Sequence, residues 1–95
     1  MKKVTAFVID LCPYCAGSKR AVKELIAEDD RYAAVDIDWI NEKEHPEMTE
    51  EYDYYYCPAF FVDGRKIYEA HPGEEYDSIR ENVNRVLDAA LEAQA

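Results

Sequence analysis

The sequence predicts one α/β domain over residues 1–95, with a four-stranded mixed sheet and helices on both faces. A chain of 95 residues suits a single compact domain and leaves no room for a second. Two patterns carry the prediction. A short apolar run at Val4–Ile9 passes into a helical pattern at Ala16–Ala27, and an Asp63-Gly64 turn separates two short strand patterns. The full order of elements is β-α-β-α-β-β-α.

The first half of the chain predicts two parallel strands joined through a helix. Val4–Ile9 is a short, β-rich apolar run, as expected for a strand that is buried on both faces. Pro13 suits the first turn of a helix, where its missing N–H costs nothing, and apolar residues then recur on one face of Ala16–Ala27. Val35–Trp39 alternates apolar residues with aspartates, which predicts a strand with one buried face. A helical connection between two such strands makes them parallel, with a right-handed crossover.

The middle of the chain predicts a short helix and an extended segment. Asn41–Asp53 is polar and acidic, and we expect a short second helix within it. Tyr54–Pro58 should be extended, because a residue before proline avoids helical geometry. The tyrosines crowded around this segment fit the core and the sheet edge, or an aromatic rim around a substrate groove.

The last third predicts a hairpin followed by a long helix. Ala59–Val62 and Arg65–Glu69 are strand patterns, and the Asp63-Gly64 pair between them is a strong signal for an antiparallel hairpin. His71–Gly73 reads as a turn. Glu74–Glu92 has apolar residues on one face and an acidic first turn, which suits the positive end of a helix dipole.

The composition limits the kinds of molecule that the protein can bind. The net charge is −10, from 11 basic and 21 acidic residues, and such a surface repels nucleic acid. It fits either a solvated surface or a basic protein partner. No apolar run is long enough to span a membrane and no signal-peptide pattern is present, so we expect a cytoplasmic protein, as a monomer. Three cysteines, an odd number, argue against a structural disulfide framework.

The chemistry centres on the motif Cys12-Pro13-Tyr14-Cys15. Two cysteines separated by two residues, between a strand and a helix, indicate a thiol–disulfide redox site. Cys12 lies just outside the first helical turn, where free backbone N–H groups stabilise a thiolate, so it is the predicted nucleophile. Cys15 lies one turn further in and is the predicted resolving thiol. An external thiol must then reduce the Cys12–Cys15 disulfide.

These residues resemble the glutaredoxin/thioredoxin family from about Lys3 to Leu91. The four-residue motif is identical to that of dithiol glutaredoxins, and Cys57-Pro58 stands where the family keeps a cis-proline before a strand and hairpin. The resemblance implies a thioredoxin fold and disulfide reductase activity. It also implies a substrate platform at Cys57 and Pro58, with Pro13 and Tyr14 as further substrate contacts. A purely structural role is the alternative for Tyr14. No tightly bound cofactor is implied, and glutathione is a possible reductant.

The flanks depart from the glutaredoxin pattern. Ile9–Leu11 precedes the motif where glutaredoxins carry a basic residue for a glutathione carboxylate. Ala70–Glu75 has one glycine where glutaredoxins have a Gly-Gly pair, and Cys57 replaces the usual Thr, Val or Ile. Both substrate classes therefore stay open at this point, protein disulfides and glutathione mixed disulfides.

Two residues near the motif have alternative interpretations. Cys57 is a small apolar filler, a third redox thiol, or a third ligand with Cys12 and Cys15 for a metal or iron–sulfur cluster. The last alternative makes the protein a metal-binding module rather than an enzyme, and neither histidine offers convincing spacing for a fourth ligand. Asp10 either raises the pKa of Cys12 or faces solvent, and Lys19 or Arg20 could offset its charge.

Overall fold

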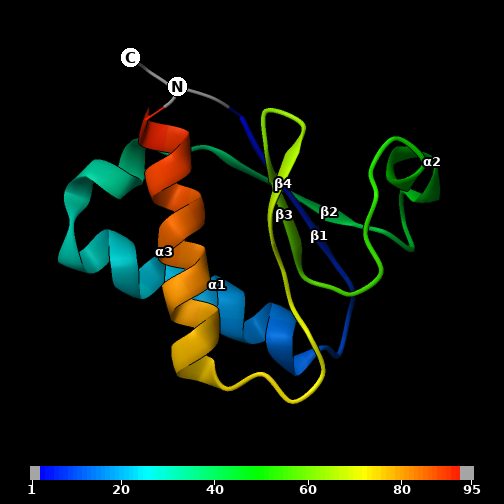
Figure 1. Ribbon diagram of the computed structural model, residues 1–95, viewed down its shortest axis with the longest axis horizontal. Coiled ribbons are helices and arrows are strands. Elements are labelled where there is room, and N and C mark those ends of the chain that lie inside the picture. Colours follow the sequence, from blue (N-terminus) through cyan, green and yellow to red (C-terminus); the bar gives the residue numbers. More distant parts are fainter. Residues whose placement is uncertain (1–2, 93–95) are drawn as a thin grey trace.

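The computed structural model describes residues 3–92 as a single sheet with helices around it (Figure 1). Its elements are β1 (Val4–Val8), α1 (Pro13–Glu28), a 3₁₀ helix η1 (Asp30–Ala34), β2 (Ile37–Asn41), α2 (Pro46–Thr49), β3 (Ala59–Val62), β4 (Arg65–Glu69) and α3 (Tyr76–Glu92). The strand order is β2-β1-β3-β4. β1 is parallel to β2 and antiparallel to β3, and β3 is antiparallel to β4. The predicted fold class, the parallel pair and the Asp63-Gly64 hairpin are confirmed.

The two long helices, α1 and α3, pack together on one face of the sheet. All five residues of β1 are buried, which explains the mainly apolar run at the start of the sequence. Phe60 of β3 is fully buried on the helical face. Its ring stacks on Tyr68 at a centroid distance of 5.8 Å and meets Trp39 edge-on at 5.7 Å. Within residues 3–92, no helix combines the length and the apolar character needed to cross a bilayer.

A smaller aromatic cluster covers the opposite face. Phe7 and Phe61 are buried there, and Tyr52 and Tyr54 pack over them. The ring of Tyr54 stacks on Phe7 at 5.0 Å, and Tyr52 meets Phe7 edge-on at 4.8 Å. The single-turn helix α2 lies on this side, away from α1 and α3 (Figure 1). Two of the crowded tyrosines therefore form core, whereas Tyr55 and Tyr56 are exposed.

Two elements begin two residues later than the sequence predicts. The second strand was expected at Val35–Trp39, but β2 begins at Ile37 because Asp30–Ala34 winds into a 3₁₀ helix. The Asp29 carboxylate accepts the N–H of Arg31 and so caps that helix. The last helix begins at Tyr76 rather than Glu74, because the Glu74 side chain turns inward and forms tertiary hydrogen bonds.

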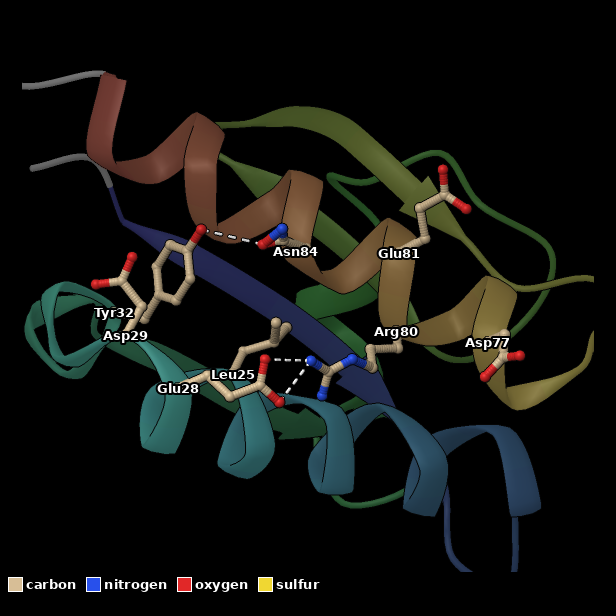
Figure 2. Close-up of a pocket in the computed structure, with 8 residues that line it drawn as sticks. All are labelled: Leu25, Glu28, Asp29, Tyr32, Asp77, Arg80, Glu81 and Asn84. Atoms are coloured by element: carbon tan, nitrogen blue, oxygen red, sulfur yellow. Dashed lines mark hydrogen bonds and ion pairs between the residues drawn. The ribbon is translucent and has the colours of Figure 1, made fainter.

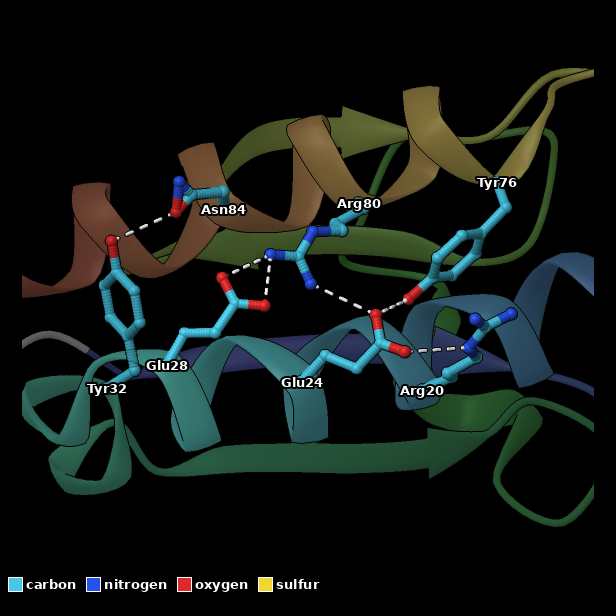
Figure 3. A network of polar contacts seen from close by, with 7 residues as sticks. All are labelled: Arg20, Glu24, Glu28, Tyr32, Tyr76, Arg80 and Asn84. Atoms are coloured by element: carbon cyan, nitrogen blue, oxygen red, sulfur yellow. Dashed lines mark hydrogen bonds and ion pairs between the residues drawn. The ribbon is translucent and has the colours of Figure 1, made fainter.

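Polar side chains join α1 to α3 along the edge of the helical layer (Figure 3). Arg80 of α3 lies between two carboxylates of α1, with one guanidinium nitrogen 3.1 Å from Glu24 and another bonded to Glu28. Tyr76 donates a hydrogen bond of 2.6 Å to the same Glu24. Tyr32 of η1, the turn after α1, donates a hydrogen bond of 3.0 Å to Asn84 of α3. These contacts fix the position of α3 on α1, and with it the turn that enters α3.

A polar cavity of about 500 Å³ opens along the same helix pair (Figure 2). Its α1 residues, Leu25 and Glu28, belong to the C-terminal half of that helix. Cys12 caps the opposite end, and a helix of 16 residues is about 24 Å long. The cavity is therefore well separated from the cysteine motif.

A buried carboxylate, Glu74, anchors the turn before α3. Its side chain accepts hydrogen bonds of 2.7 Å from Tyr68 Oη and from Ser78 Oγ. Burial alone raises the pKa of Glu74, but these hydrogen bonds outweigh burial and lower it. Glu74 therefore stabilises the fold as a carboxylate.

We expect Tyr68→Phe to lower the free energy of unfolding by about 1–3 kcal/mol at neutral pH, because it removes a hydrogen bond to a buried charge. Because the pKa of Glu74 is depressed in the folded state, this contribution is present above the ordinary carboxyl pKa of about 4.3 and is lost as the pH falls below it. Urea unfolding at neutral and acidic pH measures both effects. Tyr52→Phe, at a half-buried ring against Phe7, is the matched control, and equal losses in the two variants would contradict the role of Glu74.

Candidate active site

The end of β1 and the start of α1 place Cys12 at the mouth of the helix. Cys12 is the N-cap residue, with φ −107° and ψ 114°, and Pro13 follows it in the first turn. The Cys12 Sγ accepts the backbone N–H of Cys15 at 3.2 Å. A sulfur in this position receives an N–H that the helix itself cannot pair, and it lies at the positive end of the helix dipole. The end of the helix therefore holds the Cys12 sulfur in place through a backbone N–H.

Cys15 has a different environment one turn into the helix. Its side chain is only 4% exposed, whereas Cys12 is partly exposed. Burial first, and then the neighbouring Cys12 sulfur, raise the pKa of Cys15 to about 12. Cys15 therefore keeps its proton at neutral pH. The two thiols therefore differ in exposure, with Cys12 the more accessible. The sequence predicts this difference for a nucleophile, Cys12, and a resolving thiol, Cys15.

The segment before β3 faces the cysteine motif. The Cys57–Pro58 peptide bond is cis, as the family resemblance implied, and the Pro58 side chain is fully buried. The Cys12 thiol lies 3.7 Å from the carbonyl oxygen of Cys57 and donates to it. The structure therefore brings together two segments that lie 45 residues apart in the sequence.

Cys57 is a protonated thiol beside the two motif cysteines. Burial, followed by the charge of the Glu42 carboxylate and then by Cys15, raises its pKa to about 12. A thiol of this kind is a poor nucleophile at neutral pH. Among residues 3–92, no group of three or more histidine, cysteine or carboxylate side chains has an arrangement suited to a metal ion. The alternative of a metal or cluster site at Cys12, Cys15 and Cys57 therefore has no ligand set in this part of the chain.

Tyr14 and Pro13 line the other side of the helix mouth. Pro13 is exposed, and Tyr14 is half-buried. The Tyr14 hydroxyl accepts the backbone N–H of Gly73 at 2.7 Å. This hydrogen bond ties the motif to the turn before α3, so Tyr14 has a structural partner whether or not it also contacts a substrate.

The charged residues around the motif make contacts with other side chains. Asp10 is exposed and accepts a hydrogen bond of 3.2 Å from the Asn41 side chain. The Lys19 ammonium lies 5.4 Å from the centre of the Trp39 ring, and Lys19 lines a cleft beside Cys12 together with Asp10. Arg20 pairs with Glu24 instead. Of the two basic residues proposed to offset Asp10, only Lys19 lies at the cleft.

Sequence reasoning did not single out three residues of this region. Leu11 is an apolar residue in an exposed turn, with a positive φ of 58° and full exposure. Gly73 acts through its backbone, which leaves no side-chain signal. Glu42 follows β2 directly, but the predicted strand ended at Trp39, so the prediction placed Glu42 in a polar helix away from the site.

Comparison with known proteins gives one relative in sequence and several in structure. No protein family model matches the chain. A thioredoxin of Methanocaldococcus jannaschii is 30% identical over 73 residues, which are 77% of this chain and 84% of that protein. The structure resembles oxidized mitochondrial thioredoxin 3 of Saccharomyces cerevisiae, with a TM-score of 0.59 and 21% identity over 88% of this chain and 77% of that one. It also resembles oxidized glutaredoxin 2 of Chlamydomonas reinhardtii, with a TM-score of 0.54 and 17% identity over 97% of this chain and 81% of that one. These two structural likenesses show a common fold.

Proposed function

The chain belongs to the thioredoxin family and is a thiol–disulfide oxidoreductase, and on that premise we propose that Cys12 and Cys15 are its redox pair. One observation carries the assignment of roles. The Cys12 sulfur is partly exposed and accepts a backbone N–H at the mouth of α1, whereas Cys15 is buried with a raised pKa. Cys12 is therefore the nucleophile, and Cys15 is the resolving thiol.

The reaction has two exchange steps. The Cys12 thiolate attacks one sulfur of the substrate disulfide, forms a mixed disulfide and releases the first substrate thiolate. Cys15 then attacks the Cys12 sulfur, and the second substrate thiolate leaves as the Cys12–Cys15 disulfide forms. An external thiol, with glutathione as one candidate, returns the pair to the reduced state. Pro58 and the backbone at Cys57 support the substrate chain beside Cys12.

We propose protein disulfides, rather than glutathione mixed disulfides, as the preferred substrates. Asp10 lines the cleft beside Cys12 and offsets the charge of Lys19 there, and the net charge of −10 repels an anionic tripeptide. The fully exposed Leu11, next to Cys12, offers apolar contact to a polypeptide. Turnover of insulin disulfides and of a glutathione mixed disulfide should be compared under the same reductant. A higher kcat/KM for the glutathione substrate would contradict the proposed preference.

Leu11 provides a sharper test of this preference. Leu11 is fully exposed, and its backbone has a left-handed conformation that is unfavourable for leucine. Neither feature stabilises the fold. We expect Leu11→Asn, which suits the backbone but removes the apolar surface, to raise KM for the protein disulfide about threefold to tenfold. The kcat/KM for a glutathione mixed disulfide should change less than twofold.

Asp63→Asn is the matched control, because Asp63 also has a positive φ, of 52°, but lies in the β3–β4 turn. Both variants place asparagine at a positive φ, so a KM change shared by the two would not come from lost substrate contact at Leu11. A Leu11→Asn enzyme with an unchanged KM for the protein would contradict the role of Leu11.

A further inference from the structure

The exposed large apolar side chains of residues 3–92 gather near the thiols. They are Leu11, Met48, Tyr55 and Tyr56. Leu11 directly precedes Cys12, and the two tyrosines directly precede Cys57, with Met48 in α2 just ahead of them. Single exposed apolar residues are common on protein surfaces, whereas a group of them beside one site marks a binding surface. The two tyrosines have no role in the core, with 85% of Tyr55 and 51% of Tyr56 exposed.

One carboxylate of β4 holds the backbone of this tyrosine pair. The N–H groups of Tyr55 and Tyr56 both donate to Oε2 of Glu69, at 2.6 and 2.8 Å. Successive N–H groups that point at one anion form a concave binding loop, called a nest. The other oxygen, Oε1, accepts a hydrogen bond of 2.8 Å from Lys66. Because the two tyrosines lie outside any helix or strand, Glu69 supplies the hydrogen bonds that a regular element would otherwise provide.

Glu69 is suited to this task because it is shielded and ionised. Its side chain is only 17% exposed. Burial raises the pKa of Glu69, but the bonds from Lys66 and from the two backbone N–H groups outweigh burial and lower the pKa. Hydrogen bonds to a charged acceptor are stronger than those between neutral groups. The carboxylate therefore holds the nest firmly at neutral pH.

Contacts on either side of the tyrosine pair complete the anchoring of its backbone. Before the pair, the Tyr54 ring stacks on Phe7 at 5.0 Å. After it, the carbonyl of Pro58 accepts the N–H of Ala70 at 3.0 Å. The backbone is thus held at three places while both tyrosine rings remain exposed. An aromatic ring on a fixed backbone loses little conformational freedom on binding, which is why tyrosine is effective at protein interfaces.

The tyrosine pair is within reach of a polypeptide bound at Cys12. The Cys12 sulfur lies 3.7 Å from the carbonyl oxygen of Cys57, and Tyr56 is the next residue back along the chain. One extended residue spans at most about 3.6 Å, so the pair begins within about two residues of that contact. The residues next to a substrate cysteine can therefore meet the rings, whereas a disulfide without a peptide chain is too short to use them.

We propose that Glu69 is a positioning residue that holds Tyr55 and Tyr56 as an aromatic contact surface for the polypeptide that carries the substrate disulfide. This inference rests on the proposed preference for protein disulfides. The surface selects disulfides with apolar side chains next to the cysteine, because the tyrosine rings and Leu11 offer apolar contact on an otherwise acidic protein. Glu69 touches no substrate itself, and its effect on binding passes through the two backbone N–H groups.

Three disulfides separate this surface from the chemistry at Cys12. Two are peptide disulfides of equal length, one with leucine and one with serine on both sides of its cysteine, and the third is hydroxyethyl disulfide. All three require attack by Cys12, but only the leucine peptide gains from the aromatic surface. A wild-type protein that reduces none of them would refute the proposed function and the inference with it. An active wild type with equal kcat/KM for the two peptides would overturn the inference alone.

We expect Glu69→Ala to raise KM for the leucine peptide about threefold to tenfold, with kcat within about twofold of the wild type. The kcat/KM for the serine peptide and for hydroxyethyl disulfide should change less than about twofold. A loss shared by all three substrates would show a merely structural role and would overturn the proposal. Glu69→Gln keeps a carbonyl oxygen for the two N–H groups, so it should retain most of the affinity for the leucine peptide.

Lys66→Gln is the matched control. It removes the other partner of Glu69 but leaves both backbone N–H bonds in place. The ion pair is partly exposed and contributes little by itself. We therefore expect KM for the leucine peptide to stay within about twofold of the wild type in this variant. An increase equal to that in Glu69→Ala would assign the effect to the ion pair and would contradict the role of the nest.

A double-mutant cycle tests whether Glu69 acts through the tyrosines. The variant with Tyr55→Ser and Tyr56→Ser should raise KM for the leucine peptide at least as much as Glu69→Ala does. Adding Glu69→Ala to that variant should then change KM less than about twofold, because the surface that Glu69 positions is gone. Circular dichroism and thermal unfolding establish that each variant is folded. An unchanged KM in Glu69→Ala, or additive effects in the combined variant, would overturn the proposal.

Discussion

Cys12→Ser should abolish disulfide reductase activity, with a loss of at least about 1,000-fold in kcat/KM for a protein disulfide. A hydroxyl at this position cannot form the mixed disulfide, because the first exchange step needs a thiolate sulfur. Cys57 cannot take over, since burial and Glu42 raise its pKa to about 12 and leave it protonated at neutral pH. Reduction of insulin disulfides by the wild-type and variant enzymes measures the loss.

The same substitution should leave the N-cap of α1 intact. Cys12 is the N-cap of α1, and its side chain accepts the N–H of Cys15. Serine is among the preferred N-cap residues, and its oxygen can accept the same N–H. We therefore expect the thermal unfolding midpoint of Cys12→Ser to stay close to that of the wild type. Loss of activity in a protein of unchanged stability isolates the sulfur, whereas retained activity would show that another thiol starts the reaction.

Local patterns predicted most of the fold because each is a short-range signal. The apolar run of β1 and the Asp63-Gly64 turn depend on neighbouring residues only, and both appear in the structure. The boundary of β2 was missed because it depends on a side-chain cap: Asp29 draws the following residues into a 3₁₀ helix, which delays the strand to Ile37. Alternation of apolar and polar residues cannot reveal such a cap.

Only part of the site was predicted, because local patterns reveal neighbouring residues but not contacts between distant segments. The spacing of Cys12 and Cys15 is visible in the sequence, and the resemblance brought Pro58 beside them. Contacts between distant segments were not visible, and the hydrogen bond from Gly73 to the Tyr14 hydroxyl is one of them. Glu42 was missed because its place depends on the register of β2, whose end lies two residues beyond the predicted strand. One error in a strand boundary thus hid the carboxylate that helps to raise the pKa of Cys57.

Cys15→Ser should convert the enzyme into a trap for its substrates. Cys12 can still attack a disulfide, but no thiol one turn away resolves the product, so the mixed disulfide accumulates to about one equivalent. Mass spectrometry under non-reducing conditions measures the adduct, and its substrate half identifies the disulfide that the protein attacks. Turnover with a protein disulfide should fall about 100-fold or more, since only external thiol can then release the substrate.

Two outcomes separate Cys15 from Cys57 as the resolving thiol. Because Cys15 is only 4% exposed, a serine there places a hydroxyl in an apolar site, and Cys15→Ala provides a second variant without that polar group. Both variants should retain the adduct. An adduct that resolves at the wild-type rate in both would show that Cys57 attacks Cys12 instead, and adding Cys57→Ala would then restore the trap. We expect the opposite, because Cys15 lies one turn along α1 from Cys12, whereas Cys57 meets the Cys12 sulfur through its backbone carbonyl.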